Sequence, residues 1–240
     1  MLQTAVLDYA GASHIGHVRQ ENQDIWKVLE PLGAFIVADG MGGRKGGRLA
    51  AQLAVSTLSQ YLETQQFFEE DAQKAVKIIS QGIRAANQAV FEQGQQRLDL
   101  AGMGTTLAAM WVVTTAVICA HVGDSRIYCL RDQQLKRLTE DHTVVNEGLV
   151  QELKESSKHI LSRAVGISSH VEPSIISYPV HPGDVFMLCT DGLTNAVSEE
   201  EMSRILMEDV SVDVKAKLLV QTALNLGGKD NITLIVVKFK

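Results

Sequence analysis

The sequence predicts an α+β protein in which largely antiparallel sheets are covered by helices. Short apolar runs typical of strands alternate with pairs of amphipathic stretches typical of helices. Many neighbouring strand runs are too close together for a helical crossover, which favours antiparallel pairing. The 240 residues, 45% of them hydrophobic, can bury a large core, and we expect a single domain over residues 1–240.

The first part of the chain predicts three short strands and then two long helices. The strands are expected at 4–7, 25–29 and 34–38, separated by polar or glycine-bearing turns. Apolar residues recur at helical spacing over 48–64 and 71–93. Each of these helices is therefore expected to place one face on a core.

The middle of the chain predicts a β-rich block and then a polar connection. Strands are expected at 106–113, 116–122, 126–130 and 134–138. The polar and charged stretch 141–159 has little periodicity, so a mobile or partly helical connection is expected there.

The last part of the chain predicts two strands around two helices. The strands are expected at 185–190 and 232–239, and the helices at 198–207 and 212–226. Ser198 followed by three glutamates is a helix-start signal.

Composition and charge exclude several classes of function. The net charge of -6 comes without a long basic stretch, so nucleic acid is not an expected partner. The three cysteines show no C-x-x-C spacing and are expected to be buried hydrophobes in a reducing compartment. No targeting segment is evident because Asp8 interrupts the first apolar stretch, and the run 107–120 is shorter than the about 20 residues that cross a bilayer. We therefore expect a cytoplasmic protein without membrane contact, and a monomer because no heptad pattern occurs.

Acidic residues stand at the ends of four apolar runs. Asp39, Asp124 and Asp191 each close an expected strand, and Asp230 precedes the last one. A single Asp-Gly pair is a common turn signal, so a purely structural role stays open for each acid taken alone. Four carboxylates at one rim would need a compensating cation or raised pKa values. Oxygen ligands select magnesium or manganese over zinc, and an adjacent glycine such as Gly40 lets a backbone carbonyl reach the ion.

Two further segments have alternative interpretations. Arg19 precedes Asp24 in Arg-Gln-Glu-Asn-Gln-Asp, and its planar guanidinium suits a phosphoryl group. The alternative is a surface arginine paired with Glu21 or Asp24. The glycine-rich stretch 40–47 lacks the Walker and Rossmann spacings, so a loop-to-helix junction is expected there.

Seven short motifs occur in a fixed order along nearly the whole chain, and together they carry a resemblance to one family. They are R-x-x-N-Q-D at 19–24, V-A-D-G-M-G-G at 37–43, M-G-T-T at 103–106, H-V-G-D-S-R-I-Y at 121–128, D-H-T at 141–143, T-D-G-L at 190–193 and G-G-K-D-N-I-T at 227–233. With these motifs the chain resembles the metal-dependent protein phosphatases of the 2C type, particularly the compact bacterial serine/threonine phosphatases.

The resemblance implies a fold and an activity. The fold is a four-layer α-β-β-α sandwich of two mainly antiparallel sheets flanked by helices, with a short flap-like segment at about 141–160. The activity is hydrolysis of phosphoserine and phosphothreonine in phosphoproteins, the substrates of serine/threonine kinases. The attacking water is activated by two divalent ions, Mn²⁺ or Mg²⁺.

The resemblance also implies roles for individual residues. Asp39 bridges both ions, the Gly40 carbonyl binds one of them, and Asp191 and Asp230 bind the other. Asp24 would contact the ions from outside through metal-bound water. Asp124 and Asp191 would hold a third, weaker ion, and Arg19 would bind the substrate phosphate. Arg19, Asp39 and Asp191 are thereby the expected catalytic residues.

Two departures from the family pattern leave alternatives open. Met41 and Arg44 stand where relatives carry a histidine, so the general acid has no assigned residue; His142, His159 or a metal-bound water are candidates, and each histidine also has a structural interpretation. The segment 141–166 is shorter than in typical bacterial relatives. A catalytically weak phosphoprotein-binding module is the alternative function, whereas the acidic balance disfavours a nuclease.

Overall fold

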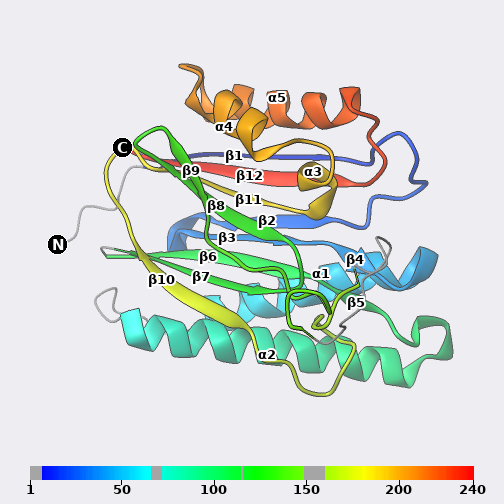
Figure 1. Ribbon diagram of the computed structural model, residues 1–240. Coiled ribbons are helices and arrows are strands. Elements are labelled where there is room, and N and C mark those ends of the chain that lie inside the picture. The colour runs from blue at the N-terminus through cyan, green and yellow to red at the C-terminus, as the bar shows by residue number, and fades with distance from the viewer. Residues whose placement is uncertain (1–6, 66–71, 115, 149–159) are drawn as a thin grey trace.

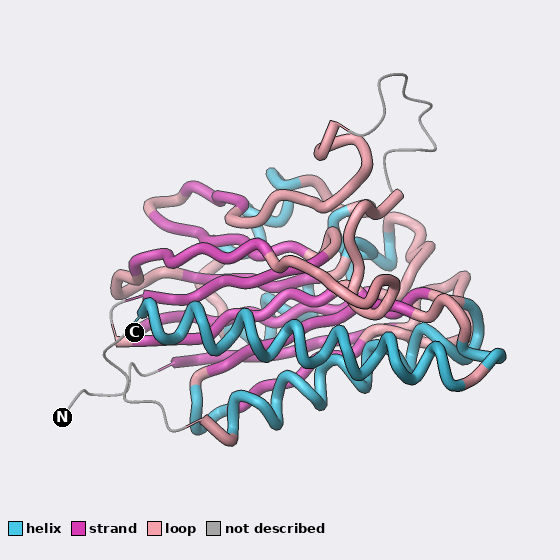
Figure 2. The backbone as a smooth tube through the Cα atoms, turned by 90° about the horizontal axis from the view of Figure 1, so that it is seen from below, coloured by secondary structure: helices cyan, strands magenta, loops and turns pink. Residues whose placement is uncertain are grey.

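A computed structural model describes residues 7–65, 72–114, 116–148 and 160–240, and it shows four layers. Two five-stranded sheets lie face to face in the middle (Figure 1). Helices α1 (Gly43–Glu63) and α2 (Ala72–Gln96) cover one sheet, as the view from below in Figure 2 shows. Helices α4 (Glu199–Met207) and α5 (Val212–Asn225) cover the other. The predicted α-β-β-α sandwich is therefore confirmed.

The sheet under α4 and α5, called sheet A here, combines both ends of the described chain. Its strands in spatial order are β1 (Leu7–His14), β12 (Ile232–Phe239), β11 (Val185–Cys189), β8 (Arg126–Arg131) and β9 (Gln134–Arg137). All neighbouring pairs are antiparallel. Between β11 and α4 lies the one-turn helix α3 (Asp191–Thr194).

The sheet on α1 and α2, called sheet B here, is also antiparallel throughout. Its strands in spatial order are β10 (Ser174–Pro179), β7 (Ala116–Val122), β6 (Leu107–Val113), β3 (Ala34–Ala38) and β2 (Ile25–Leu29). A separate short ladder pairs β4 (Gly40–Met41) with β5 (Gly104–Thr105), and two 3-10 turns cover Glu30–Leu32 and Leu98–Leu100.

The inner strands are apolar on both faces because each sheet is buried on both sides. In β3, Phe35 and Val37 pack between the two sheets, whereas Ile36 between them packs toward α1 and α2. In β12, Ile235 faces the other sheet while Leu234 packs under α5. This alternation produces three stacked apolar layers, and it explains why these strands read as continuous hydrophobic runs.

Most expected elements are found within three residues of their predicted limits, and the main differences are as follows. The expected strand 4–7 lies almost entirely outside the described residues, and β1 instead spans Leu7–His14. The edge strand β10 and the short helix α3 were not expected. Helix α1 begins earlier than predicted, at Gly43, directly within the glycine-rich stretch, so the expected loop-to-helix junction is confirmed.

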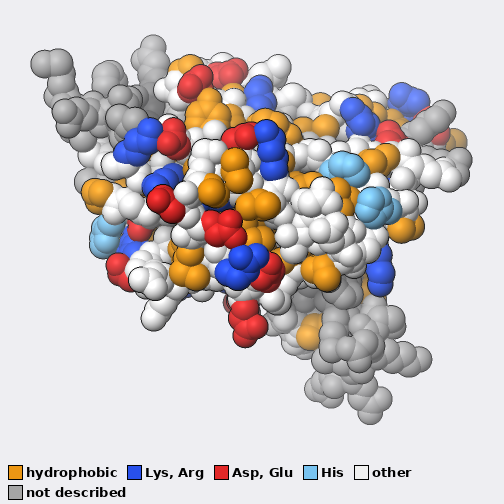
Figure 3. Space-filling view, turned by 90° about the horizontal axis from the view of Figure 1, so that it is seen from above, with side chains coloured by type: hydrophobic (Ala, Val, Ile, Leu, Met, Phe, Trp, Pro, Cys, Tyr) orange, Lys and Arg blue, Asp and Glu red, His pale blue; other side chains and the backbone are white. Residues whose placement is uncertain are grey.

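The polar connection after Asp141 is only partly described. Residues up to 148 form turns, Thr143 bridges to Leu161, and 149–159 lie outside the described residues. Acidic and basic side chains are interspersed on the face above α4 and α5 (Figure 3), as in the ion pairs of Arg204 with Glu201 and of Lys217 with Asp213. In the described part of the chain, no helix has the length and apolar character that crossing a bilayer requires.

Candidate active site

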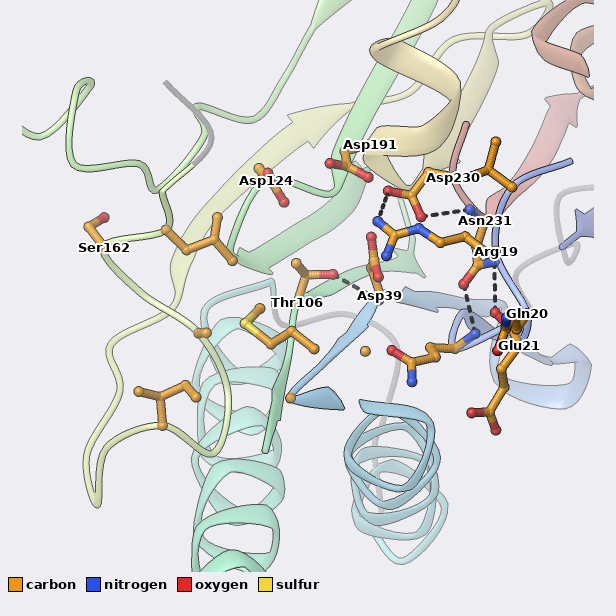
Figure 4. Close-up of a pocket in the computed structure, with 18 residues that line it drawn as sticks. Arg19, Gln20, Glu21, Asp39, Thr106, Asp124, Ser162, Asp191, Asp230 and Asn231 are labelled. Atoms are coloured by element: carbon orange, nitrogen blue, oxygen red, sulfur yellow. Dashed lines mark hydrogen bonds and ion pairs between the residues drawn. The ribbon is translucent and has the colours of Figure 1, made fainter. Parts of the chain in front are cut away.

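Four acids from the two sheets meet at one end of the sandwich. Asp39 follows β3 and Asp124 lies just after β7. Both strands pair antiparallel with β6 and therefore point the same way, so their ends share one edge. In sheet A, Asp191 begins α3 after β11, and Asp230 precedes β12, which is antiparallel to β11. All four line a single pocket of about 880 Å³ (Figure 4).

Backbone and hydroxyl hydrogen bonds hold the Asp39 position. The Asp39 N–H donates to Thr106 Oγ1 at 2.9 Å, and the Thr106 N–H and Thr105 Oγ1 both donate to the Asp39 carbonyl, at 2.9 and 2.8 Å. Thr106 Oγ1 also contacts Ser125 Oγ at 2.6 Å, next to Asp124 in the chain. The segments that carry Asp39 and Asp124 are thus fixed to each other through one threonine.

Asp24 lies behind the pocket wall and is 5% exposed. Its Oδ2 accepts a hydrogen bond from Thr190 Oγ1 at 2.9 Å, and its Oδ1 is buried without a hydrogen-bond partner among the described residues. Thr190 in turn pairs with Thr233 across β11 and β12. Burial raises the Asp24 pKa to about 7, against the lowering effect of the two threonine hydroxyls.

The carboxylates also perturb one another. Burial raises the Asp39 pKa well above its usual value, and the negative charges of Asp24, Asp191, Asp230 and Asp124 raise it further. Burial, followed by the charges of Asp191 and Asp141, raises the pKa of Asp124 to about 7. These acids lie close enough to repel each other, so the site attracts protons or cations.

Arg19 reaches the same pocket from the loop before β2. Its Nη2 donates to Asp230 Oδ2 at 2.6 Å, while its side chain stays 55% exposed. The alternative pairing of Arg19 with Glu21 or Asp24 is therefore wrong. The loop is fastened to β12 by Asn231, whose Oδ1 accepts from the Gln23 N–H at 2.8 Å and whose Nδ2 donates to the Glu21 carbonyl at 3.0 Å.

The oxygen donors in the pocket fit a hard divalent ion, but the side chains do not form a complete coordination site. Among the described residues, no three histidine, cysteine or acidic side chains stand in an arrangement that could itself hold a metal. Asp230 is turned toward Arg19 instead. Carboxylate oxygens nevertheless dominate the site, and a Cβ at Gly40 would lie 2.1 Å from the Gly47 carbonyl oxygen, so only glycine fits there.

The histidine candidates for a general acid gain no support. His142 is 3% exposed and stacks on His121 with ring centroids 4.4 Å apart. Its Nδ1 accepts from the Gly123 N–H at 3.2 Å, so its Nε2 carries the proton and donates to Ser174 Oγ at 2.9 Å. Burial lowers its pKa to about 3, which favours the structural interpretation. His159 lies outside the described residues.

Sequence reasoning missed the polar residues that support the acids. Thr106, Thr190, Thr233 and Asn231 carry no obvious chemistry and received no role. They lie within the motifs M-G-T-T, T-D-G-L and D-N-I-T, so their place in these motifs is the sequence feature that could have identified them. Met41 lines the pocket, whereas the side chain of Arg44 lies outside the described part.

Comparisons with known proteins agree on one family. The family model described as protein phosphatase 2C matches residues 10–225. The serine/threonine phosphatase stp of Listeria monocytogenes serotype 4b is 36% identical over 236 residues, which cover 93% of this chain and 92% of the relative.

Solved structures agree as well. The serine/threonine phosphatase of S. agalactiae superposes with a TM-score of 0.90 at 32% identity and covers 98% of this chain and 100% of that one. The catalytic domain of the serine/threonine phosphatase PstP, solved in complex with two manganese ions, superposes with a TM-score of 0.84 at 34% identity, covering 98% and 99%.

Proposed function

The chain belongs to the protein phosphatase 2C family and is a metal-dependent protein serine/threonine phosphatase, and we propose how its residues divide this work. The observation that carries the proposal is the convergence of Asp39, Asp124, Asp191 and Asp230 with Arg19 on one pocket. Two of these acids come from each sheet, and no local turn requires all four to meet.

We assign the metal-holding groups as follows. Asp39 and the Gly40 carbonyl would hold one ion, and Asp39, Asp191 and Asp230 would hold a second. Asp24, which lies behind the wall, acts through water. A pair of Mn²⁺ or Mg²⁺ ions, when bound, lowers the pKa of water and offsets the charge of the phosphoryl oxygens. A third and weaker ion would use Asp124 with Asp191.

Arg19 is assigned to the phosphoryl group of the substrate. Its guanidinium presents paired donors that match phosphate oxygens, and its exposure lets it turn. Its Nη2 is paired with Asp230 in the structure, so opening this ion pair would free both ends of the guanidinium for phosphate. The hydrogen bond from the Gln23 N–H to Asn231 holds the loop that carries Arg19 beside the pocket. None of the described side chains is assigned to protonate the departing alkoxide.

Several broader properties belong to the same proposal. The substrates are phosphoproteins, and the chain acts as a monomeric cytoplasmic enzyme. The proposal includes a single domain over residues 1–240; most of the flap-like segment expected at about 141–160 lies outside the described residues, at 149–159.

The test is metal-dependent release of phosphate from a phosphothreonine peptide. The wild-type protein should release phosphate with added Mn²⁺ and stop when a chelator is added, and Asp39→Asn should lose most of the activity. Asp213→Asn is the matched control, because Asp213 is an exposed acid on α5 that pairs only with Lys217 among the contacts described. A second measurement is the rise in unfolding temperature on Mn²⁺ titration, which Asp39→Asn should reduce.

The competing function makes the opposite prediction. A phosphoprotein-binding module would bind the phosphopeptide and release no phosphate with Mn²⁺ or Mg²⁺. That result would replace the proposed activity.

A further inference from the structure

One side of the pocket is apolar, and the assigned chemistry does not use it. The side chains of Met41, Leu161, Ala164 and Ile167 line this side, which we call the apolar wall. In Figure 4, Ser162, which lies within the same segment of the chain, stands across the pocket from Arg19 and Asp230. The pocket therefore has one charged side for the phosphoryl group and one side suited to carbon.

Ile167 is the most exposed part of the apolar wall, at 49%. The outer end of its side chain covers Gly104, where a Cβ would come within 2.7 Å of Ile167 Cδ1 and 2.9 Å of Cγ1. Gly104 pairs with Met41 in the β4–β5 ladder, so Ile167 and Met41 lie over the same two-stranded element. The rest of Ile167 remains exposed, and the residue lines the pocket.

The backbone that carries Ile167 is held on both sides. The residue before it, Gly166, donates its N–H to Asn87 Oδ1 at 2.7 Å, and the residue after it, Ser168, accepts from Asn87 Nδ2 at 3.0 Å. Asn87 is 1% exposed and belongs to α2. A pair of backbone hydrogen bonds, of 3.0 and 2.9 Å, also joins Val165 to Thr105 of β5.

An exposed apolar side chain on a fixed backbone is a preorganised contact, because binding to it costs little ordering entropy. The pocket volume of about 880 Å³ lies in the upper part of the range for ligand sites, so it holds more than a phosphoryl group. A residue beside the phosphorylated one would extend along the wall.

We propose that the apolar wall binds an aliphatic side chain adjacent to the phosphorylated residue, so that this phosphatase selects phosphopeptides with a large apolar flanking residue. The inference rests on the proposed function, since it concerns the same pocket. Partial burial of a leucine side chain corresponds to a gain of roughly five- to tenfold in kcat/KM. The gain should appear in KM, because the contact is made equally in the bound substrate and in the transition state.

The first experiment compares matched phosphothreonine peptides in the presence of Mn²⁺. The residue before or after the phosphothreonine is Leu, Gly, Glu or Lys, and all other positions are the same. The Leu peptides should have the highest kcat/KM for at least one of the two positions. Equal values for Leu and Gly at both positions, or a preference for Glu or Lys, would overturn the inference. Failure to hydrolyse any of the peptides would instead count against the proposed function.

The second experiment assigns the preference to the wall. Ile167→Ser should bring the Leu-to-Gly ratio close to one, whereas Ile167→Leu should keep it. Ile176→Ser is the matched control, because Ile176 is 38% exposed on β10, is not among the residues that line the pocket, and should keep the wild-type ratio. Unfolding temperatures of the variants separate loss of fold from loss of selectivity. A wild-type ratio in folded Ile167→Ser would show that Ile167 only covers Gly104.

Discussion

Replacing Asn87 by alanine tests how far one buried amide stabilises the segment at the pocket. Asn87 lies on α2 and is the residue through which that helix holds the backbone on both sides of Ile167. The Gly166 N–H that it binds is buried, whereas the Ser168 carbonyl is only partly buried. The two groups therefore respond differently when the amide is removed.

The expected loss follows from these two contacts. The Gly166 N–H would stay inside the protein without an acceptor, at a cost of about 1–3 kcal/mol. The Ser168 carbonyl would regain water, so its lost bond costs about 0.5–1 kcal/mol. The sum is about 1.5–4 kcal/mol, or roughly 3–16 °C in unfolding temperature for a chain of this size.

The assay is reversible denaturation of Asn87→Ala followed by the peptide comparison. Asn225→Ala is the control, since the Asn225 side chain is exposed near the end of α5 and accepts from Gln221 Nε2 at 2.9 Å, and it should lose less than about 0.5 kcal/mol. The folded Asn87→Ala protein should also discriminate less between Leu and Gly peptides, because the backbone at Ile167 is held less firmly when only the hydrogen bonds of Val165 with Thr105 remain of those described. A loss below about 1 kcal/mol would refute the reasoning that Asn87 is the main fastening of this segment.

Three further predictions concern the acids and their supports. The pKa of Asp24 and of Asp124 is raised to about 7, so the contribution of these two acids to the stability of the metal-free protein should be fully present below the unfolded pKa of about 4 and be lost as pH rises through about 7. Mn²⁺ binding near pH 6 should then release protons, which calorimetry in two buffers of different ionisation enthalpy measures. Asp141→Ala should cost about 3 kcal/mol in denaturant unfolding because it leaves two partly buried arginines without their carboxylate, whereas Arg204→Ala on the surface should cost less than about 1 kcal/mol. Gly192→Ala would put its Cβ 1.9 Å from the Asn231 carbonyl oxygen, so it should lose more than about 2 kcal/mol and weaken the Mn²⁺-induced rise in unfolding temperature; unchanged unfolding would contradict it.

The inner strands were predictable because burial on both faces leaves little choice of side chain. The run from Ala34 to Ala38 and the run from Ile232 to Phe239 are found at the limits predicted for them. The edge strand β1 was missed because its middle, Ala10 to Ser13, consists of small residues and includes Gly11, which is a common turn residue. In the structure Gly11 lies against the ring of Trp26, where a Cβ would come within 2.5 Å of the ring, so the glycine serves packing.

The positions of the acids could be predicted, but their partners could not. Asp39, Asp124 and Asp191 stand where apolar runs end, and local sequence contains that information. The ion pair between Arg19 and Asp230 joins residues far apart in the chain, so a surface pair with a near neighbour was the local alternative. The hydroxyl contact from Thr190 to Asp24 likewise depends on how the two sheets are stacked, which no local pattern encodes.

The division of the acids between the two sheets links activity to the integrity of the whole sandwich. Asp39 and Asp124 are carried by sheet B, and Asp191 and Asp230 by sheet A. A partly unfolded molecule in which either sheet has separated would keep only half of the carboxylates. Substitutions in the apolar layer between the sheets, for example at Phe186, are therefore expected to act on catalysis by altering the alignment of the two halves.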